Sequence, residues 1–510
     1  MRIHHYFQGA LLAALTIAAT GVTLSAQAQK HKAGARSETI PVTTHSEKAR
    51  QAYETGMRQR EDLLYTEDGL QSIRDAVKAD PHFALAHATI AYFTVDPAEE
   101  KRERTLSISE IGDASPDEKL LIRWMNGTKN GQLVPAIAAM NDLLAKYPND
   151  KRLANLDAEW LCSGQQNYER GEAVLEAVLK ADPNYFPALN NIAYCYALNG
   201  KVNLAPAFMD RYVLALPNQP NPQDSYAEIL RMAGDFQGAL DHYRAALKID
   251  PAFFSSQVGI ASTYALMGDQ ERARAEYPKA IEMTKDSATK LNYRMLWALT
   301  YYREHRAEEA RKAFTELAAE AHNEGFPVQE AESHRTMALF STDVTAALAE
   351  LDAALAVLSE KHVLSHEDHD TELATILQTR AFIAARAGMP NVAQKALEPL
   401  AAIARTSRNN LVQQSFHSAS GAVLYAQGKY AEAISELQYD PRNPLSLELL
   451  ADAQAKNKDS AEGQKTLETL AAINDERVET AFAAPPARAA LKSNSSPTAQ
   501  ATGHIGGPLR

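Results

Sequence analysis

Apolar and polar residues alternate along most of this chain with the spacing of amphipathic helices. Between residues 186 and 217, one apolar stripe precedes Gly200 and a second one follows it. Apolar positions three, four and seven residues apart share one side of a helix. The stripes therefore predict pairs of short helices. Three successive pairs carry them at Leu189, Ile192, Ala193, Tyr196, Ala205, Met209 and Tyr212; at Tyr226, Ala227, Leu230, Ala239, Tyr243 and Ala246; and at Ile260, Ala261, Tyr264, Ala273, Tyr277 and Ala280.

Prolines and glycines mark the ends of these helices. Because proline cannot continue a helix, each proline is expected to close one and reset the chain for the next. Glycine can end the first helix of a pair in a left-handed conformation. Both residue types recur with a period close to 34 residues, which predicts a repeated helix–turn–helix unit. The prolines are Pro81, Pro116, Pro148, Pro183, Pro217 and Pro251, and the glycines are Gly200, Gly234 and Gly268.

This period resembles the tetratricopeptide repeat, a 34-residue helical hairpin with small residues at its eighth and twentieth positions. Ala193, Ala227 and Ala261 match the eighth position, and Ala205, Ala239 and Ala273 match the twentieth. The match weakens outside 186–282, and between about 326 and 410 the helices are expected to be longer. Hairpins of this kind stack to bury their apolar faces. The resemblance implies an all-α, right-handed α-solenoid of about twelve units between Ser46 and Asn474, whose first helices line a concave groove.

The segments outside the repeats predict the rest of the organisation. Residues 1–28 have the features of a secretory signal peptide: Arg2, an uncharged apolar stretch over 9–24, and small residues that place cleavage after Ala28. A retained membrane anchor is the alternative, but the apolar stretch is short for a bilayer span. We expect a flexible lead-in over 29–45, a regular array over 46–325, a less regular array over 326–474 and a flexible tail over 475–510.

Charge and cysteine content narrow the possible functions. The formal net charge of -12 argues against nucleic-acid binding, which needs clustered lysine and arginine. The two cysteines, Cys162 and Cys195, fall about one unit apart on the first helices of neighbouring units. An exported protein can form a disulfide. However, helices packed 8–10 Å apart leave little room for one, so two unpaired core cysteines are the default expectation.

The sequence offers little chemistry for catalysis. It contains no glycine-rich phosphate loop, no nucleophile elbow and no C-x-x-C pair. His362, His366 and His369 would share one face of a helix with metal-compatible spacing. Their segment has the composition of an exposed joint between units, and it is not an HExxH motif. We therefore expect no catalytic residue and no cofactor, with these histidines as the one metal candidate.

The resemblance places ligand contacts at the second, fifth, ninth and twelfth positions of each first helix. Asp224 and Glu228 occupy such positions where a clamp for a C-terminal carboxylate would need lysine or arginine, so that mode of binding is not expected. The candidate groove residues are Asn190, Tyr194, Asn221, Asp224, Glu228, Arg231, Ser262, Asn292, Leu299 and Tyr302.

Three functions remain open at this point. The first is a non-catalytic scaffold that binds a protein or peptide in the bacterial cell envelope, in the periplasm or outside the cell. The second is a fixed subunit of an envelope assembly or secretion complex. The third is a metal-dependent binder or enzyme at the three histidines. A solenoid fold alone does not name its ligand.

Overall fold

The computed structural model describes residues 39–61, 66–360 and 364–494 of this chain. Over these residues it contains 25 α-helices and no β-strand. The first 24 form twelve consecutive antiparallel hairpins, here called units 1 to 12. The expected all-α solenoid of about twelve helix–turn–helix units is therefore confirmed. The proposed signal peptide lies outside the described residues.

The first six units include the most regular part of the array. A short 3-10 turn, Ile111–Asp113, precedes unit 3, and another, Val202–Leu204, lies within unit 5. The helices are α1 (Glu47–Glu61) and α2 (Thr66–Ala79), α3 (Ala84–Phe93) and α4 (Pro97–Ser109), α5 (Pro116–Lys129) and α6 (Leu133–Lys146), α7 (Lys151–Glu159) and α8 (Tyr168–Ala181), α9 (Phe186–Leu198) and α10 (Pro206–Ala215), and α11 (Pro220–Ala233) and α12 (Phe236–Ile249).

The later units include longer helices, as expected, and α19 is 21 residues long. One additional helix, α25 (Val478–Asn494), follows unit 12. The remaining helices are α13 (Phe254–Met267) and α14 (Gln270–Met283), α15 (Ser287–Arg303) and α16 (Ala307–Glu324), α17 (Pro327–Leu339) and α18 (Val344–Ser359), α19 (His366–Arg386) and α20 (Pro390–Thr406), α21 (Asn410–Ala426) and α22 (Tyr430–Leu437), and α23 (Pro444–Lys456) and α24 (Ser460–Ala471).

Turns within the units follow the expected chemistry. Gly234 ends α11 with φ 85°, in the left-handed region that glycine adopts at little cost. Asp235 then caps α12 by accepting a 2.9 Å hydrogen bond from the amide of Gly238. Pro251 lies in the turn after α12, as predicted. Pro116 differs from the prediction: it is the first residue of α5, where its missing amide hydrogen costs nothing.

Small residues allow the helices of each unit to approach closely. The six alanines that match the repeat positions, Ala193, Ala205, Ala227, Ala239, Ala261 and Ala273, are all fully buried. At Gly259 a Cβ atom would lie 2.3 Å from the ring of Tyr243. The alternation of small and large side chains predicted from the sequence is therefore the packing of the core.

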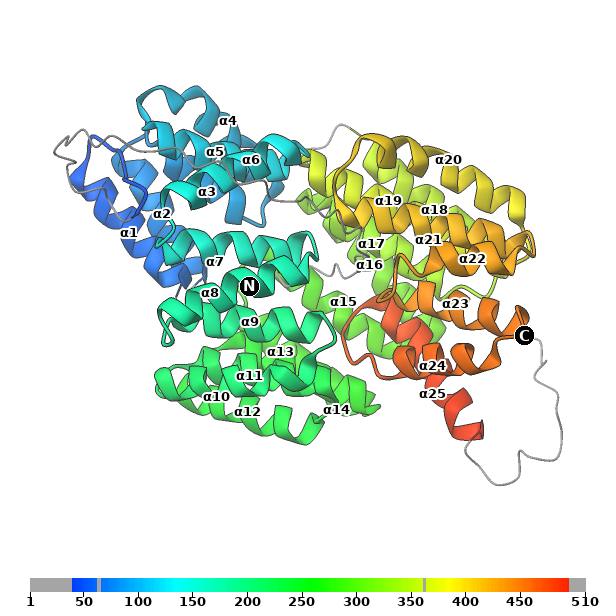
Figure 1. The fold of residues 1–510 in the computed structure, drawn as a ribbon. Coiled ribbons are helices and arrows are strands. Elements are labelled where there is room, and N and C mark those ends of the chain that lie inside the picture. The colour runs from blue at the N-terminus through cyan, green and yellow to red at the C-terminus, as the bar shows by residue number, and fades with distance from the viewer. Residues whose placement is uncertain (1–38, 62–65, 361–363, 495–510) are drawn as a thin grey trace, which may run out of the picture.

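The array curls until its later units contact its earlier ones, seven units back. Asn410, at the start of unit 11, donates a 2.6 Å hydrogen bond from Nδ2 to the carbonyl of Gln165, at the end of the first helix of unit 4. Equivalent contacts join units 3 and 10, units 5 and 12, and unit 6 and the segment before α25. In Figure 1 the yellow to red helices lie beside the cyan to green ones. The three equivalent contacts between units pair Lys129 with Asp368, Leu198 with Arg442, and Arg231 with Glu476.

Both ends of the array are more ordered than expected. The lead-in from residue 39 onward is bound to units 1 to 4, because the amide of Ile40 donates to Asp150 and the amide of Thr43 donates to Glu118. Most of the described part of the tail expected from residue 475 is instead helix α25. Its Val478 and Ala484 are buried. The adjacent prolines Pro485 and Pro486 hid this helix in the sequence, because proline inside a helix usually ends it.

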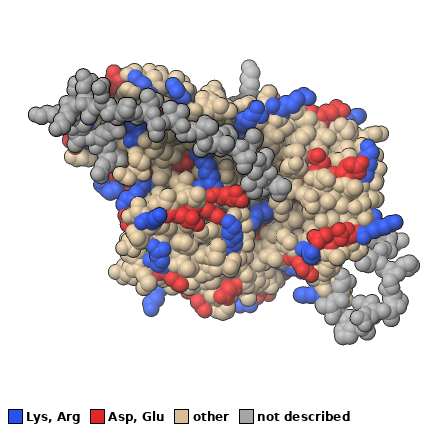
Figure 2. Space-filling model, viewed as in Figure 1, with Lys and Arg blue, Asp and Glu red and all other residues tan. Residues whose placement is uncertain are grey.

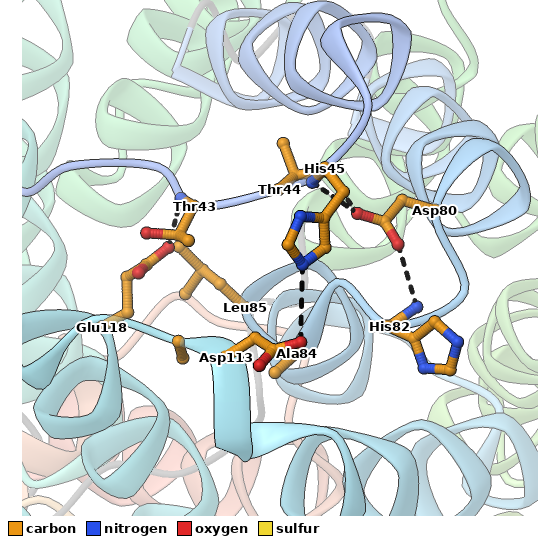
Figure 3. A pocket seen from close by; sticks show the side chains of 10 residues that line it. Thr43, Thr44, His45, Asp80, His82, Ala84, Leu85, Asp113 and Glu118 are labelled. Carbon is orange, nitrogen blue, oxygen red and sulfur yellow. Dashed lines mark hydrogen bonds and ion pairs between the residues drawn. The ribbon is translucent and has the colours of Figure 1, made fainter.

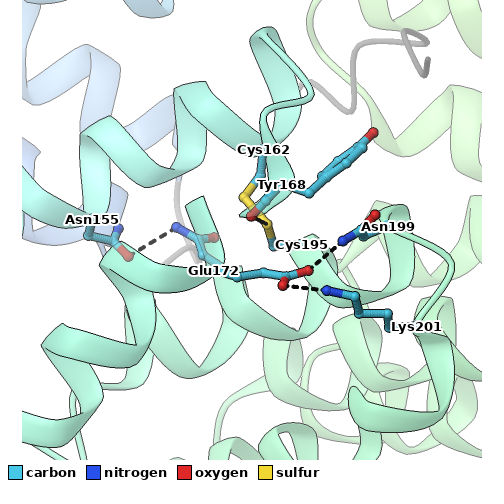
Figure 4. Close-up of a disulfide and its surroundings, with 8 residues drawn as sticks. Asn155, Cys162, Tyr168, Glu172, Cys195, Asn199 and Lys201 are labelled. Carbon is cyan, nitrogen blue, oxygen red and sulfur yellow. Dashed lines mark hydrogen bonds and ion pairs between the residues drawn. A yellow bond between two sulfur atoms is a disulfide. The ribbon is translucent and has the colours of Figure 1, made fainter. Parts of the chain in front are cut away.

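Cys162 and Cys195 form a disulfide, with Cα atoms 5.5 Å apart, which corrects the expectation of two unpaired cysteines (Figure 4). Regular packing of α7 and α9 would hold the two cysteines too far apart. The backbone after α7 instead widens into a π-helical turn, Trp160–Gly164, that carries Cys162. Gly171 leaves the space that the bridge needs, since a Cβ there would lie 2.3 Å from Cys162 Sγ.

The exposed surface mixes both signs of charge. Figure 2 shows lysine and arginine interspersed with aspartate and glutamate across the face in view. Among the residues that the structure describes, no helix is both long and apolar enough to cross a bilayer.

Candidate binding site

The ten groove residues expected from the resemblance lie on the first helices of units 5 to 8. Glu228 and Asn292 are partly exposed. The others are buried, and Asn190 is fully so. Several of these side chains, including Tyr194 and Arg231, bind other residues of the same chain. The eight buried residues are Asn190, Tyr194, Asn221, Asp224, Arg231, Ser262, Leu299 and Tyr302.

Arg231 is the centre of a polar network that joins units 5 and 6 to the C-terminal segment. The hydroxyl of Tyr194 donates a 2.8 Å hydrogen bond to Glu228 Oε2, and Arg231 Nη2 lies 3.1 Å from Glu228 Oε1. Arg231 Nη1 pairs with Glu476. Burial alone would lower the pKa of Arg231, but the adjacent Glu476, Tyr243 and Glu228 raise it above its ordinary value. The guanidinium is therefore a permanent buried cation that needs acidic partners.

Asp224 is a buried acidic residue on α11, the helix that also carries Glu228 and Arg231. Ser256 Oγ donates a 2.6 Å hydrogen bond to its Oδ1 from the next unit. Burial, with a further contribution from the negative charge of Glu228, raises the pKa of Asp224 to about 7. Near neutral pH this carboxyl group is therefore partly protonated, whereas an exposed aspartate is almost fully ionised.

A small cavity lies beside Glu476, between units 7 and 8. Its lining combines apolar side chains with the guanidinium of Arg303, whose pKa is lowered by burial. Tyr277, also in the lining, shares a 3.0 Å hydrogen bond with Ser262. The cavity shows that Glu476 enters the face formed by the first helices. Its lining residues are Ser262, Ala265, Leu266, Tyr277, Leu296, Leu299, Arg303 and Glu476.

Aromatic rings continue this face through units 8 to 10. Tyr302 stacks on Phe340 at 4.3 Å between ring centroids, and Phe482 of α25 meets Phe340 edge-on at 5.6 Å. Phe382 contacts Phe482 from α19 at 6.1 Å. Arg335 on α17 pairs with Glu479, the second residue of α25. The C-terminal segment thus supplies two carboxylates, Glu476 and Glu479, and the phenyl ring of Phe482 to the face formed by the first helices.

The segment between α24 and α25 is fixed by its own arginines. Arg488 donates from Nη2 to the carbonyl of Ile473 at 2.6 Å and to Asn474 Oδ1 at 3.0 Å. Arg477 pairs with Asp475 at 2.7 Å. Glu476, Glu479 and Phe482 were not predicted as part of a site, because their segment has the composition of a flexible tail. No local pattern marked them, because their partners lie far away in the sequence.

A polar cleft lies at the N-terminal end of the array, where the lead-in crosses units 2 and 3 (Figure 3). Asp80 accepts hydrogen bonds from the hydroxyl of Thr44 and from the amides of His45 and His82, at 3.1 Å for each amide. Burial would raise the pKa of Asp80, but these hydrogen bonds outweigh it and lower the pKa. The Asp80 carboxylate is used to bind the lead-in, so the cleft is a structural clasp.

Of the three histidines considered for metal binding, His366 and His369 lie on one helix and His362 is not among the described residues. Helix α19 begins at His366, with Ser365 as its cap, so His362 precedes it. His366 lies 3.5 Å from Asp370, and His369 lies 3.1 Å from the same carboxylate. In the part of the chain that the structure describes, no three His, Cys, Asp or Glu side chains are grouped so as to hold a metal ion.

Comparison with known proteins agrees with this architecture. Two family models described as tetratricopeptide repeat match residues 163–224 and 254–287. The TPR repeat-containing protein YpiA of Bacillus subtilis (strain 168) is 26% identical over 165 residues, covering 32% of this chain and 39% of that protein. The chain is therefore a helical repeat protein with two segments that match the tetratricopeptide repeat. Its match spans about two-fifths of this relative.

Solved structures with the same kind of helical array match at low similarity. The Cut9 and Hcn1 assembly of the APC/C is similar at a TM-score of 0.41 and 15% identity, covering 82% of this chain and 78% of that one. The human IFIT1 dimer gives 0.40 and 15%, covering 82% and 93%. A tetratricopeptide repeat protein from Parabacteroides merdae gives 0.34 and 15%, covering 53% and 93%. At these scores no binding property is transferred to this chain.

Proposed function

We propose that this chain is an exported, non-catalytic scaffold that binds a protein or peptide partner in the bacterial cell envelope. The observation that carries the proposal is the pairing of Arg231 with Glu476 in the face formed by the first helices. An irregular segment of polypeptide, residues 473–477, is bound there through a charged side chain. A surface that binds one extended segment has the chemistry to bind another.

Two further features support the envelope location. The apolar stretch over residues 9–24, followed by small residues up to Ala28, has the pattern of a cleaved export signal. The Cys162–Cys195 disulfide suits a compartment that is oxidising rather than the reducing cytosol. Both features point to a protein that works in the periplasm or outside the cell.

Photo-crosslinking in the native envelope tests the proposal. A photo-reactive residue would replace Asn292, a partly exposed member of the predicted groove set, and crosslinked partners would be identified by mass spectrometry. A matched probe at Glu468, on the exposed side of α24, is the control. One dominant partner at position 292, absent at 468, supports a groove binder. A partner at both positions in fixed stoichiometry would instead favour a subunit of an envelope assembly. No partner at either position contradicts the proposal.

Cell fractionation tests the location separately. The mature chain is expected in the periplasmic or external fraction, and deletion of residues 9–24 should leave it in the cytoplasm with both cysteines reduced. A full-length chain found in the cytoplasm would contradict export, whatever it binds.

A further inference from the structure

The C-terminal segment, residues 473–488, binds the face formed by the first helices as a peptide ligand would. Three of its side chains, spaced three residues apart, each contact a different part of that face. Glu476 pairs with Arg231 on α11, Glu479 pairs with Arg335 on α17, and Phe482 packs between aromatic rings of units 9 and 10. In Figure 1 this part of the chain, in red, lies between α15 and the orange helices α23 and α24.

The two arginines make this face selective for acids. The side chains of Arg231 and Arg335 are only 5% and 6% exposed, so neither can recover its hydration if Glu476 or Glu479 is removed without replacement. Glu228 and Glu332 would then be the nearest acidic side chains that remain. The chain as a whole is acidic, with a formal net charge of -12. The face therefore recognises acidic groups through local buried arginines rather than through long-range attraction.

Helix α25 buries smaller apolar side chains than the neighbouring helix α23, so apolar packing holds it less strongly. The apolar side chains that α25 buries are mostly alanines, which remove little apolar area from water. Helix α23 buries Leu445, Leu447, Leu449 and Leu450 instead. Two adjacent prolines, Pro485 and Pro486, also interrupt the backbone hydrogen bonding of α25. Because proline has no amide hydrogen, the carbonyls of Ala481 and Phe482 lose their helical donors. The buried members of α25 include Ala481, Ala483, Ala484 and Ala487.

We propose that residues 473–488 are a displaceable internal ligand, and that the partner is a peptide with the same chemistry: an acidic residue, a second acidic residue three positions later, and an aromatic residue three positions after that. The partner binds at the same place as residues 473–488 and displaces them from the array. This inference rests on the proposed function and specifies the partner for the same face.

Competition between the segment and a copy of itself tests the inference. The probe is a fluorescein-labelled synthetic peptide of residues 473–488, added to the full mature chain and followed by fluorescence anisotropy. The triple variant Glu476→Ala, Glu479→Ala, Phe482→Ala should bind this peptide at least tenfold more tightly than the unchanged chain. Glu468→Ala, an exposed change on α24, should leave peptide binding as it is. A labelled peptide with lysine at both acidic positions should not bind either protein.

Equal peptide affinity in the triple variant and the unchanged chain would overturn the inference, as would a folded triple variant that does not bind. Circular dichroism establishes whether the variant is folded. If it is not, hydrogen exchange on the unchanged chain decides. Amides of α25 should then open at least tenfold more often than those of α23, whereas equal protection of the two helices overturns the inference. A partner crosslinked at position 292 would still support the proposed function, so the two failures are distinguishable.

Discussion

Arg442, in the loop before α23, donates a hydrogen bond to the backbone carbonyl of Leu198, 244 residues earlier in the chain. Two further contacts between the turns span 245 residues each: Asn410 with Gln165, and Glu476 with Arg231. Such regularity shows that the superhelix returns to itself every seven units. Contacts between successive turns therefore supplement the contacts between adjacent units, on which a simple solenoid depends.

Gly200 allows the first test of these contacts between turns. It adopts φ 74°, and a Cβ there would lie 2.2 Å from Arg442 Nη2. Gly428 has the same φ with open space around it. Both Gly200→Ala and Gly428→Ala carry the cost of a left-handed alanine, about 1 kcal/mol. Only Gly200→Ala also displaces Arg442, so urea unfolding should show a further loss of about 1–2 kcal/mol. Equal losses in the two variants would mean that the contact between the turns contributes nothing to stability.

The disulfide is expected to stabilise the chain substantially. Its cysteines are 33 residues apart, and closing a loop of this size stabilises a protein by about 2–4 kcal/mol. The double change Cys162→Ala, Cys195→Ala should therefore lower the melting temperature measured by circular dichroism. Reduction of the unchanged chain should give a similar decrease. An unaltered melting temperature in both cases would contradict this prediction.

The loss of stability caused by Gly171→Ala should depend on the presence of the disulfide. Gly171→Ala places a methyl group against Cys162 Sγ and should destabilise the bridged chain by about 1–3 kcal/mol. In the chain that lacks both cysteines the Sγ atom is absent, so the same change should cost much less. Thermal unfolding of the four proteins in this cycle measures the difference. A cost independent of the cysteines would show that Gly171 is required for another reason.

The buried carboxyl of Asp224 should make stability fall as the pH rises. Its pKa is raised to about 7 by burial, whereas an unfolded aspartate has a pKa near 4. The folded state therefore binds the proton more tightly. Its stabilising effect is complete below pH 4 and is lost as the pH rises through 7. Asp224→Asn keeps the acceptor for Ser256 and should raise the free energy of unfolding at pH 8 by about 1–3 kcal/mol.

Urea unfolding between pH 5 and pH 8 measures this effect. The slope of stability against pH should be shallower in Asp224→Asn than in the unchanged chain. Asp241→Asn, at an exposed position, is the matched control and should retain the original slope. Identical slopes in all three proteins would show that Asp224 does not bind a proton in this range.

Asp80 should fix the lead-in to the array. Asp80→Ala removes the acceptor for the amides of His45 and His82 and for the hydroxyl of Thr44. The expected result is faster hydrogen exchange over residues 40–46 and a loss of about 1–2 kcal/mol. Asp75→Ala, at an exposed pair with Lys78, should change neither quantity. Unchanged exchange in Asp80→Ala would mean that the lead-in is bound by its other contacts.

The repeat units could be predicted because their signals are local. Ala227 and Ala239 are buried in the contact between α11 and α12, and a spacing of 12 residues in one hairpin is visible in the sequence. Glu476 is different. Its partner Arg231 precedes it by 245 residues, and no periodic pattern relates an irregular segment to a buried arginine. The binding roles of the ten groove residues remain predictions, although the structure assigns internal partners to Tyr194, Glu228 and Arg231.

The disulfide was missed for another reason. The sequence places Cys162 and Cys195 on neighbouring first helices, and regular α-helices would hold their Cα atoms too far apart. One π-helical turn at Trp160–Gly164 changes that geometry. The residues of this turn do not predict a π-helical conformation, so the disulfide could be recognised only from the backbone of the structure.

The disulfide also has a consequence for the order in which the chain acquires its structure. It joins residues within one local stretch of units 4 and 5, so it can close as soon as about 200 residues of the chain are available to fold. The contacts between turns must wait for more than 170 further residues, since the earliest of these contacts along the chain uses Asp368. Closing so long a loop is slow. The first turn should therefore be cross-linked early and serve as the template on which the second turn assembles.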